Sequence, residues 1–74
     1  MADTTLNLRG LKCPLPALRA KKALRGMQSG DLLTLECTDP LTAIDIPNLC
    51  RETGDQLESK AAGEGLLTFN IRKK

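Results

Sequence analysis

The spacing of two prolines most constrains the fold of this 74-residue chain. Pro14 and Pro16 lie between a short run of alternating apolar residues and a longer run with helical spacing. An α-helix accepts proline readily only in its first turn, where the missing backbone N–H would have no partner within the helix. The sequence therefore predicts that a helix begins at Pro14 or Pro16, and that Cys13 lies at or next to its N-cap.

Cys13 is the candidate functional residue of this stretch. The N-terminus of a helix presents unpaired N–H groups and the positive end of the helix dipole, and both favour a thiolate over a thiol. Lys12 adds a positive charge beside the sulfur, so we expect the pKa of the Cys13 thiol to be lowered. The sequence thus predicts a nucleophilic sulfur that Pro14 and Pro16 position at the helix start.

The chain contains no histidine, and its three cysteines form no Cys-x-x-Cys pair. Catalytic pairs of cysteine with histidine and Ser–His–Asp triads are therefore excluded within the chain. A closed zinc site needs four ligands, which three scattered thiols do not supply. We expect no disulfide framework, no metal and no other cofactor.

Charge is unevenly distributed along the chain. Residues 1–30 contain six basic residues and one acidic residue, whereas residues 31–74 contain five basic and eight acidic residues. The basic residues surround Cys13 and cover the helix that follows it. Lys12, Arg19 and Lys22 are candidates for tuning the thiolate or for docking an acidic partner. A solvated helix face without further function is the alternative.

Hydrophobic periodicity predicts six elements in the order β-α-β-α-β-β. The predicted strands cover residues 4–9, 31–38, 56–61 and 66–72, with a hairpin loop over 62–65. The first helix ends at Gly26, and two later start signals, Asp39-Pro40 and Asp45-Ile46-Pro47, predict a helical turn over 40–44 and a separate helix over 45–53. Helical crossovers make the strands that they join parallel neighbours, and the hairpin adds an antiparallel strand. We expect one domain over residues 1–74, an α/β (α+β) two-layer sandwich with a mixed four-stranded sheet and both helices on one face.

Apolar rows at these periods predict the core. From the strands and the second helix we expect to find buried Leu6, Leu8, Leu33, Leu35, Cys37, Ile46, Leu49, Cys50, Thr53, Leu67, Phe69 and Ile71. The first helix adds Leu15, Leu18, Ala20, Ala23, Leu24 and Met27. Cys37 and Cys50 fit these rows and are predicted to act as small apolar residues, which leaves Cys13 as the functional cysteine.

The chemistry open to Cys13 is narrow. Without a base, an acid or a metal, a thiolate is poorly suited to hydrolysis, but it can attack an electrophilic sulfur and hold the sulfur as a persulfide. Disulfide exchange usually needs a second thiol nearby, which the sequence does not offer. We therefore favour a carrier over an oxidoreductase or a stand-alone enzyme with multiple turnovers.

The stretch Leu8–Pro16, with Leu18 and Lys21–Leu24 behind it, resembles the TusA/SirA-like sulfur carriers and their Cys-Pro-x-Pro motif. The similarity runs nearly end to end, through Gly30-Asp31, Asp39-Pro40, Asp45-Ile46-Pro47, Cys50 and Gly54. It implies a fold like the C-terminal domain of bacterial translation initiation factor three. Many members carry a histidine shortly after the glycine that matches Gly54, whereas this chain has Asp55, so no role of that histidine is transferred.

The resemblance also implies partners. Cys13 would accept persulfide sulfur from a cysteine desulfurase or a rhodanese-type donor and pass it to a DsrE-type or other acceptor protein. The relay could serve tRNA 2-thiolation, sulfur oxidation or cofactor synthesis, so any link to tRNA is indirect. An RNA-binding or protein-binding regulatory module that uses the basic first helix is the alternative function.

Two further expectations concern location and assembly. No apolar run approaches the ~18 residues that a membrane-spanning helix needs, and the first residues lack the basic and apolar regions of a signal peptide. We therefore expect a cytoplasmic protein that makes no membrane contact and is a monomer.

Overall fold

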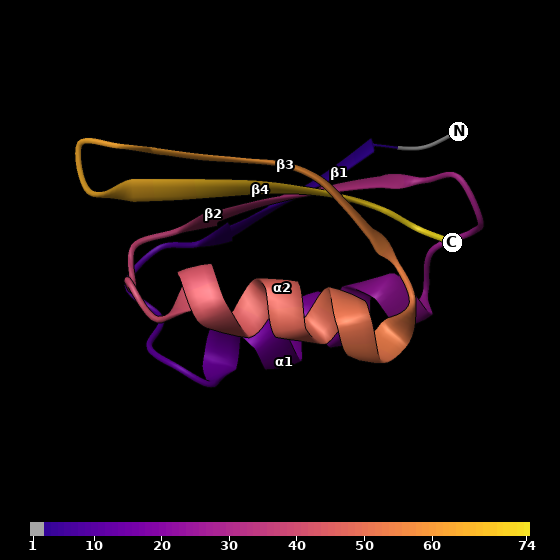
Figure 1. Ribbon diagram of the computed structural model, residues 1–74, viewed down its shortest axis with the longest axis horizontal. Coiled ribbons are helices and arrows are strands. Elements are labelled where there is room, and N and C mark those ends of the chain that lie inside the picture. Colours follow the sequence, from indigo (N-terminus) through magenta and orange to yellow (C-terminus); the bar gives the residue numbers. More distant parts are fainter. Residues whose placement is uncertain (1–2) are drawn as a thin grey trace.

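The computed structural model describes residues 3–74. Its six elements are β1 (Asp3–Leu8), α1 (Leu15–Arg25), β2 (Leu32–Cys37), α2 (Thr42–Thr53), β3 (Gln56–Gly63) and β4 (Leu66–Arg72). The four strands form one layer and the two helices lie together on one face of it (Figure 1). The predicted two-layer sandwich with a mixed sheet is therefore confirmed.

The order of the strands differs from the prediction in one respect. The sheet runs β1-β2-β4-β3, with β1 parallel to β2 and with β4 antiparallel to both of its neighbours. We predicted that the second helical crossover would place β3 beside β2, but β4 lies between them. The cause is the composition of the two strands: β4 supplies buried Phe69 and Ile71, whereas β3 is exposed at all but one of its residues and is suited to an edge.

The core lies between the sheet and the helices, as predicted. Leu33, Leu35 and Cys37 of β2 are fully buried. The other buried apolar side chains are Leu8, Ala20, Leu24, Ile46, Leu49, Cys50, Phe69 and Ile71. The prediction that Cys37 and Cys50 are core residues is confirmed. Thr53, however, is exposed, because it lies in the last turn of α2, beyond the part of the helix that packs on the sheet.

Helix α1 starts one residue later than Pro14. Pro14 is its N-cap residue, Pro16 lies in the first turn as predicted, and Cys13 therefore precedes the N-cap. The Cys13–Pro14 peptide bond is cis. The buried stripe of α1 runs through Pro16, Ala20 and Leu24, at a spacing of four residues. The prediction that Leu15 and Leu18 are buried is wrong, because both lie off this stripe and are exposed.

Helix α2 is continuous, whereas the sequence predicted two separate helical segments. The Asp39-Pro40 signal is real, since the carboxylate of Asp39 accepts the Leu41 N–H at 3.0 Å and its carbonyl accepts the Thr42 N–H at 3.0 Å. Pro47 lies inside the helix and has no N–H to donate to the carbonyl four residues earlier. Burial of the α2 face against the sheet carries the helix past this residue, because tertiary packing supplies most helical stability.

The hairpin between β3 and β4 is tighter than predicted. Gly63 pairs with Leu66, which leaves Glu64 and Gly65 as the two loop residues. Both have positive φ angles, 52° and 78°, as a type I′ turn requires. Strand β3 therefore extends to Gly63 rather than ending at residue 61.

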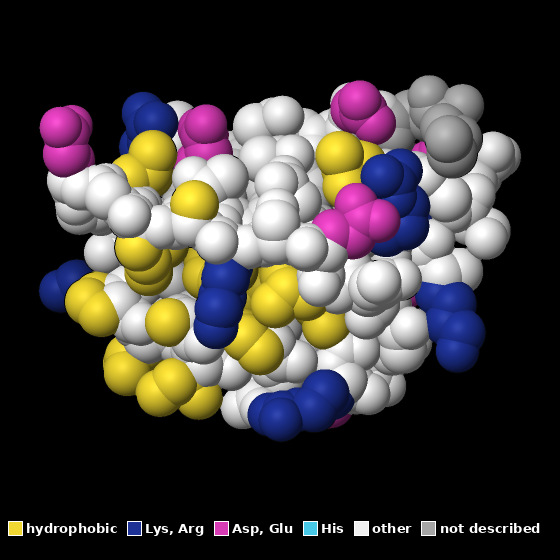
Figure 2. All heavy atoms as spheres, turned by 45° about the horizontal axis from the view of Figure 1, so that its top comes forward, with side chains coloured by type: hydrophobic (Ala, Val, Ile, Leu, Met, Phe, Trp, Pro, Cys, Tyr) yellow, Lys and Arg dark blue, Asp and Glu magenta, His cyan; other side chains and the backbone are white. Residues whose placement is uncertain are grey.

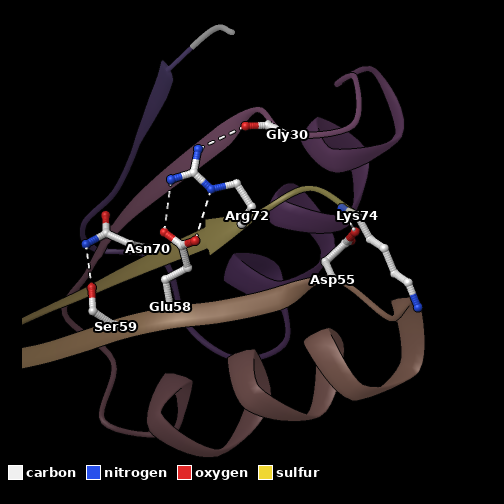
Figure 3. Close-up of polar contacts among 7 residues, drawn as sticks. All are labelled: Gly30, Asp55, Glu58, Ser59, Asn70, Arg72 and Lys74. Carbon is white, nitrogen blue, oxygen red and sulfur yellow. Dashed lines mark hydrogen bonds and ion pairs between the residues drawn. The ribbon is translucent and has the colours of Figure 1, made fainter.

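Polar contacts hold the C-terminal end of the chain (Figure 3). Arg72 forms a bidentate ion pair with Glu58, with N···O distances of 3.0 and 3.1 Å, and donates to the Gly30 carbonyl. Asp55 is buried, and its Oδ1 accepts the backbone N–H of Lys74 at 3.0 Å. Asp55 therefore ties the loop after α2 to the end of the chain. In the part of the chain that is described, no helix has both the length and the apolar character to span a membrane.

Candidate active site around Cys13

Two loops meet at one edge of the sheet and form the site. Because β1 and β2 are parallel, the β1–α1 loop and the β2–α2 loop leave the same edge. Gly10 donates its N–H to Thr38 Oγ1 at 2.9 Å, and Cys13 donates its N–H to Asp39 Oδ2 at 2.7 Å. These bonds fix Cys13 at the carboxyl ends of the strands, where ligands bind in open α/β sheets.

The thiol of Cys13 is exposed and contacts one carboxylate. Its Sγ lies 2.6 Å from Asp45 Oδ2, in the first turn of α2, and donates a hydrogen bond to it. This bond raises the pKa of the Cys13 thiol, with smaller contributions in the same direction from partial burial and from the negative charges of Asp45 and Asp39. The predicted lowering of this pKa is therefore wrong for the protein on its own, in which the contact with Asp45 shifts the pKa of the thiol upward.

The physical reason for this correction is the position of the sulfur. Cys13 precedes the N-cap, so its side chain is displaced from the first turn, where the unpaired N–H groups lie. The tertiary fold instead brings two carboxylates from the β2–α2 region to it. A nearby negative charge disfavours a thiolate.

Asp39 has a different role from Asp45. Hydrogen bonds from the N–H groups of Cys13 and Leu41, together with the charge of Lys12, lower the pKa of the Asp39 carboxyl. Asp39 is therefore a fixed anion that joins the two loops. The sequence predicts Asp39 as a helix start but not its contact with Cys13, although loops that follow neighbouring parallel strands are expected to meet.

The predicted basic residues divide into two groups. Lys12 lines a surface hollow with Cys13 and Leu41. Arg19 and Lys22 line a different hollow, between α1 and β1, in which Cys13 has no part. Lys21, which the sequence analysis did not select, lines a second hollow next to Cys13, together with Asp45 and Glu52.

Four exposed apolar side chains lie in or next to the first turns of α1 and α2, the helices that contribute the hollows beside Cys13. The apolar ring, as we name it, consists of Leu15, Leu18, Leu41 and Ile44, whose exposed fractions are 47%, 56%, 52% and 61%. Figure 2 shows hydrophobic side chains gathered at the end of the molecule where α2 begins. Clustered apolar side chains of this size at a surface typically mark a protein contact.

Comparison with known proteins identifies the family. The family model described as "Sulfurtransferase TusA" matches residues 4–73. The chain belongs to the TusA family. It is 46% identical to the sulfur carrier protein TusA of Allochromatium vinosum over 72 residues, which cover 96% of this chain and 93% of that protein. It is 39% identical to TusA of Pseudomonas savastanoi over 72 residues, which cover 97% and 86% of the two chains.

A solved structure supports the same fold. The SirA-like protein of Desulfitobacterium hafniense superposes with a TM-score of 0.81, covering 93% of this chain and 95% of that chain at 24% identity. The resemblance to the TusA/SirA-like carriers is therefore confirmed, and the sulfur carrier is favoured over the RNA-binding or regulatory module. Within residues 3–74, no three metal-ligating side chains come together.

Proposed function

We propose that this protein carries sulfur as a persulfide on Cys13, accepting it from one protein and passing it to another. The observation that carries the proposal is the exposed thiol of Cys13. The backbone N–H of this residue is held by Asp39, and the exposed side chains of the apolar ring lie on the helices of the same site. Membership of a family whose relatives are named sulfur carrier proteins supports it. Cys37 and Cys50 are buried and do not compete for the sulfur.

The transfer itself needs no cofactor. The Cys13 sulfur attacks the terminal sulfur of a persulfide on the donor, a new S–S bond forms, and the S–S bond of the donor breaks, leaving its electron pair on the donor cysteine. The terminal sulfur keeps its oxidation state, so neither an oxidant nor a reductant is consumed. Unloading follows the same chemistry: a thiol of the acceptor attacks the terminal sulfur of the Cys13 persulfide, and the electron pair of the broken S–S bond stays on Cys13.

Partner proteins complete the reaction, and the resemblance to the TusA/SirA-like carriers implies their classes. The donor is a cysteine desulfurase or a rhodanese-type protein, and the acceptor is a DsrE-type or other thiol protein. The end use would be tRNA 2-thiolation, sulfur oxidation or another sulfur-trafficking route. The cytoplasm suits such a carrier, because its thiols are kept reduced there.

The basic residues are assigned to docking. Lys12 and Lys21 lie beside the hollows that Cys13 lines, where they can contact acidic side chains on a donor or an acceptor. Arg19 and Lys22 lie on the side of α1 that faces β1 and would contact only a partner that extends to that side. Pro14 and Pro16 fix the start of α1 directly after the sulfur.

Mass spectrometry after incubation with a desulfurase, its cofactor and cysteine tests the proposal. We expect one added sulfur per chain, mapped to the Cys13 peptide and absent from Cys13→Ser. Cys50→Ala is the matched control, since it removes a buried thiol and should still load. Equal sulfur on Cys37 or Cys50, or no loading from either a desulfurase or a rhodanese-type donor, would contradict the proposal.

A further inference from the structure

The carboxylate of Asp45 is in direct contact with the sulfur of Cys13. Its Oδ2 accepts the thiol hydrogen of Cys13, and the two heavy atoms lie 2.6 Å apart. Asp45 is held on α2, where its own N–H donates to the Leu41 carbonyl at 3.0 Å. The carboxylate on α2 and the sulfur in the β1–α1 loop are therefore brought together from positions 32 residues apart in the chain.

Comparison with Asp39 shows which carboxylate is free to take a proton. Both oxygens of Asp39 are occupied by backbone N–H groups, from Cys13 and from Leu41. Among residues 3–74, the thiol of Cys13 is the one hydrogen-bond partner of the Asp45 side chain. Protonation of Asp39 would break the bonds that hold the loop, whereas protonation of Asp45 changes only its bond to the thiol.

The proposed function needs such a group. The thiol of Cys13 must lose its proton to become a strong nucleophile, and the fold raises the pKa of this thiol. The chain has no histidine to act as a base. The other charged groups around the sulfur are Lys12, Lys21, Asp39 and Glu52, and none of them is hydrogen-bonded to Sγ.

We propose that Asp45 is the general base and general acid of the carrier: it takes the proton of the Cys13 thiol as Sγ attacks the donor persulfide, and gives that proton to the departing donor thiolate. This inference rests on the proposed function. During loading, the S–H bond of Cys13 breaks and its proton moves to Asp45 Oδ2, while Sγ forms a bond to the terminal sulfur of the donor persulfide. The donor cysteine leaves as a thiolate and then receives the proton from Asp45. The donor therefore ends as a thiol, and Cys13 ends as a persulfide.

Docking of the donor would close the site around Asp45 and Cys13. Asp45 is half-buried, and Leu18 and Ile44 of the apolar ring lie on the two helices that meet at Cys13. A partner seated on the apolar ring would exclude water from the site, so that the proton passes between Cys13, Asp45 and the donor cysteine without exchange with solvent.

The variant Asp45→Asn removes both the negative charge and the base, and two assays measure the two effects separately. Asparagine has nearly the same size and can still accept the thiol hydrogen, but it carries no negative charge and takes no proton at neutral pH. Loss of the charge should speed alkylation of Cys13 by iodoacetamide. Loss of the base should slow single-turnover loading from a persulfidated desulfurase by about 100-fold, the lower range for a general base. A purely electrostatic or structural role would move both rates in the same direction.

Two further variants control the experiment. Glu52→Gln removes one negative charge from the same hollow without touching the thiol, and should load at the wild-type rate. Asp45→Glu restores a carboxylate and should recover part of the loading rate that Asp45→Asn loses. Circular dichroism of each variant checks that α2 is intact.

The outcomes distinguish this inference from the proposed function. Loading of Asp45→Asn at or above the wild-type rate, or a parallel fall in alkylation and loading, overturns the role of Asp45 and leaves the carrier intact. A wild-type protein that gains no sulfur on Cys13 overturns the carrier function, and the role of Asp45 with it. Slow loading together with fast alkylation supports both.

Discussion

The backbone N–H of Cys13 donates to Oδ2 of Asp39 at 2.7 Å and joins two loops that are 26 residues apart in the sequence. This bond holds the reactive residue by its main chain, so the thiol stays exposed and free to react. Parallel pairing of β1 and β2 makes the bond possible, because it brings the ends of both strands to one edge of the sheet.

The stability of the protein should depend on the charge of Asp39. Its carboxyl has a lowered pKa in the folded state, so it adds stability above the unfolded pKa of about 4, and this contribution is lost as the pH falls through the folded value. The urea midpoint of the wild-type protein should therefore fall in acid more steeply than that of Asp39→Asn. Parallel pH dependence of the two midpoints would contradict this role.

Thiol reagents should distinguish the three cysteines. Cys13 is exposed, whereas Cys37 and Cys50 are buried. We expect one thiol per folded chain to react with a disulfide reagent and three to react in denaturant. The rate for the folded protein should still be rising above pH ~8.5, the ordinary thiol value, because the pKa of Cys13 is raised. A rate that is already at its plateau at neutral pH would mean that Cys13 is a thiolate.

The apolar ring should govern partner docking. Leu18→Ser and Ile44→Ser each remove an exposed apolar side chain from the first turn of a helix at the site and should weaken donor binding by about tenfold, or about 1.4 kcal/mol. Loading kinetics should show a higher KM, while the rate of iodoacetamide alkylation stays at the wild-type value. Lys60→Ser, on exposed strand β3, is the control and should change neither. Unchanged KM in both ring variants would exclude this surface from donor docking.

The small core should be sensitive to loss of its one aromatic residue. Phe69 is 1% exposed and lies in the central strand β4. Phe69→Ala should lower the free energy of unfolding by about 3–5 kcal/mol, measured by urea denaturation. Thr68→Ala, one position along the strand and on the opposite face, should have a much smaller effect. A loss below about 1 kcal/mol at Phe69 would show that the core is not built around this ring.

The sequence by itself determined the type of each element and pointed to Cys13 as the candidate functional residue. Alternation in the strands, helical spacing around Ala20 and Leu24, and proline at the helix start are local patterns that a short window of sequence contains. The exclusion of Cys37 and Cys50 as functional residues followed from the same patterns, since each lies in an apolar row.

Only the tertiary structure decided the order of the strands and the direction in which the pKa of Cys13 is shifted. The position of β4 between β2 and β3 depends on which strand buries more apolar surface, a comparison across the whole chain. The local sequence around Cys13 is basic and predicted a thiolate, but folding places Asp39 and Asp45 against it. Electrostatic interaction depends on distance in space, so residues 26 and 32 positions away outweigh the neighbours in the sequence.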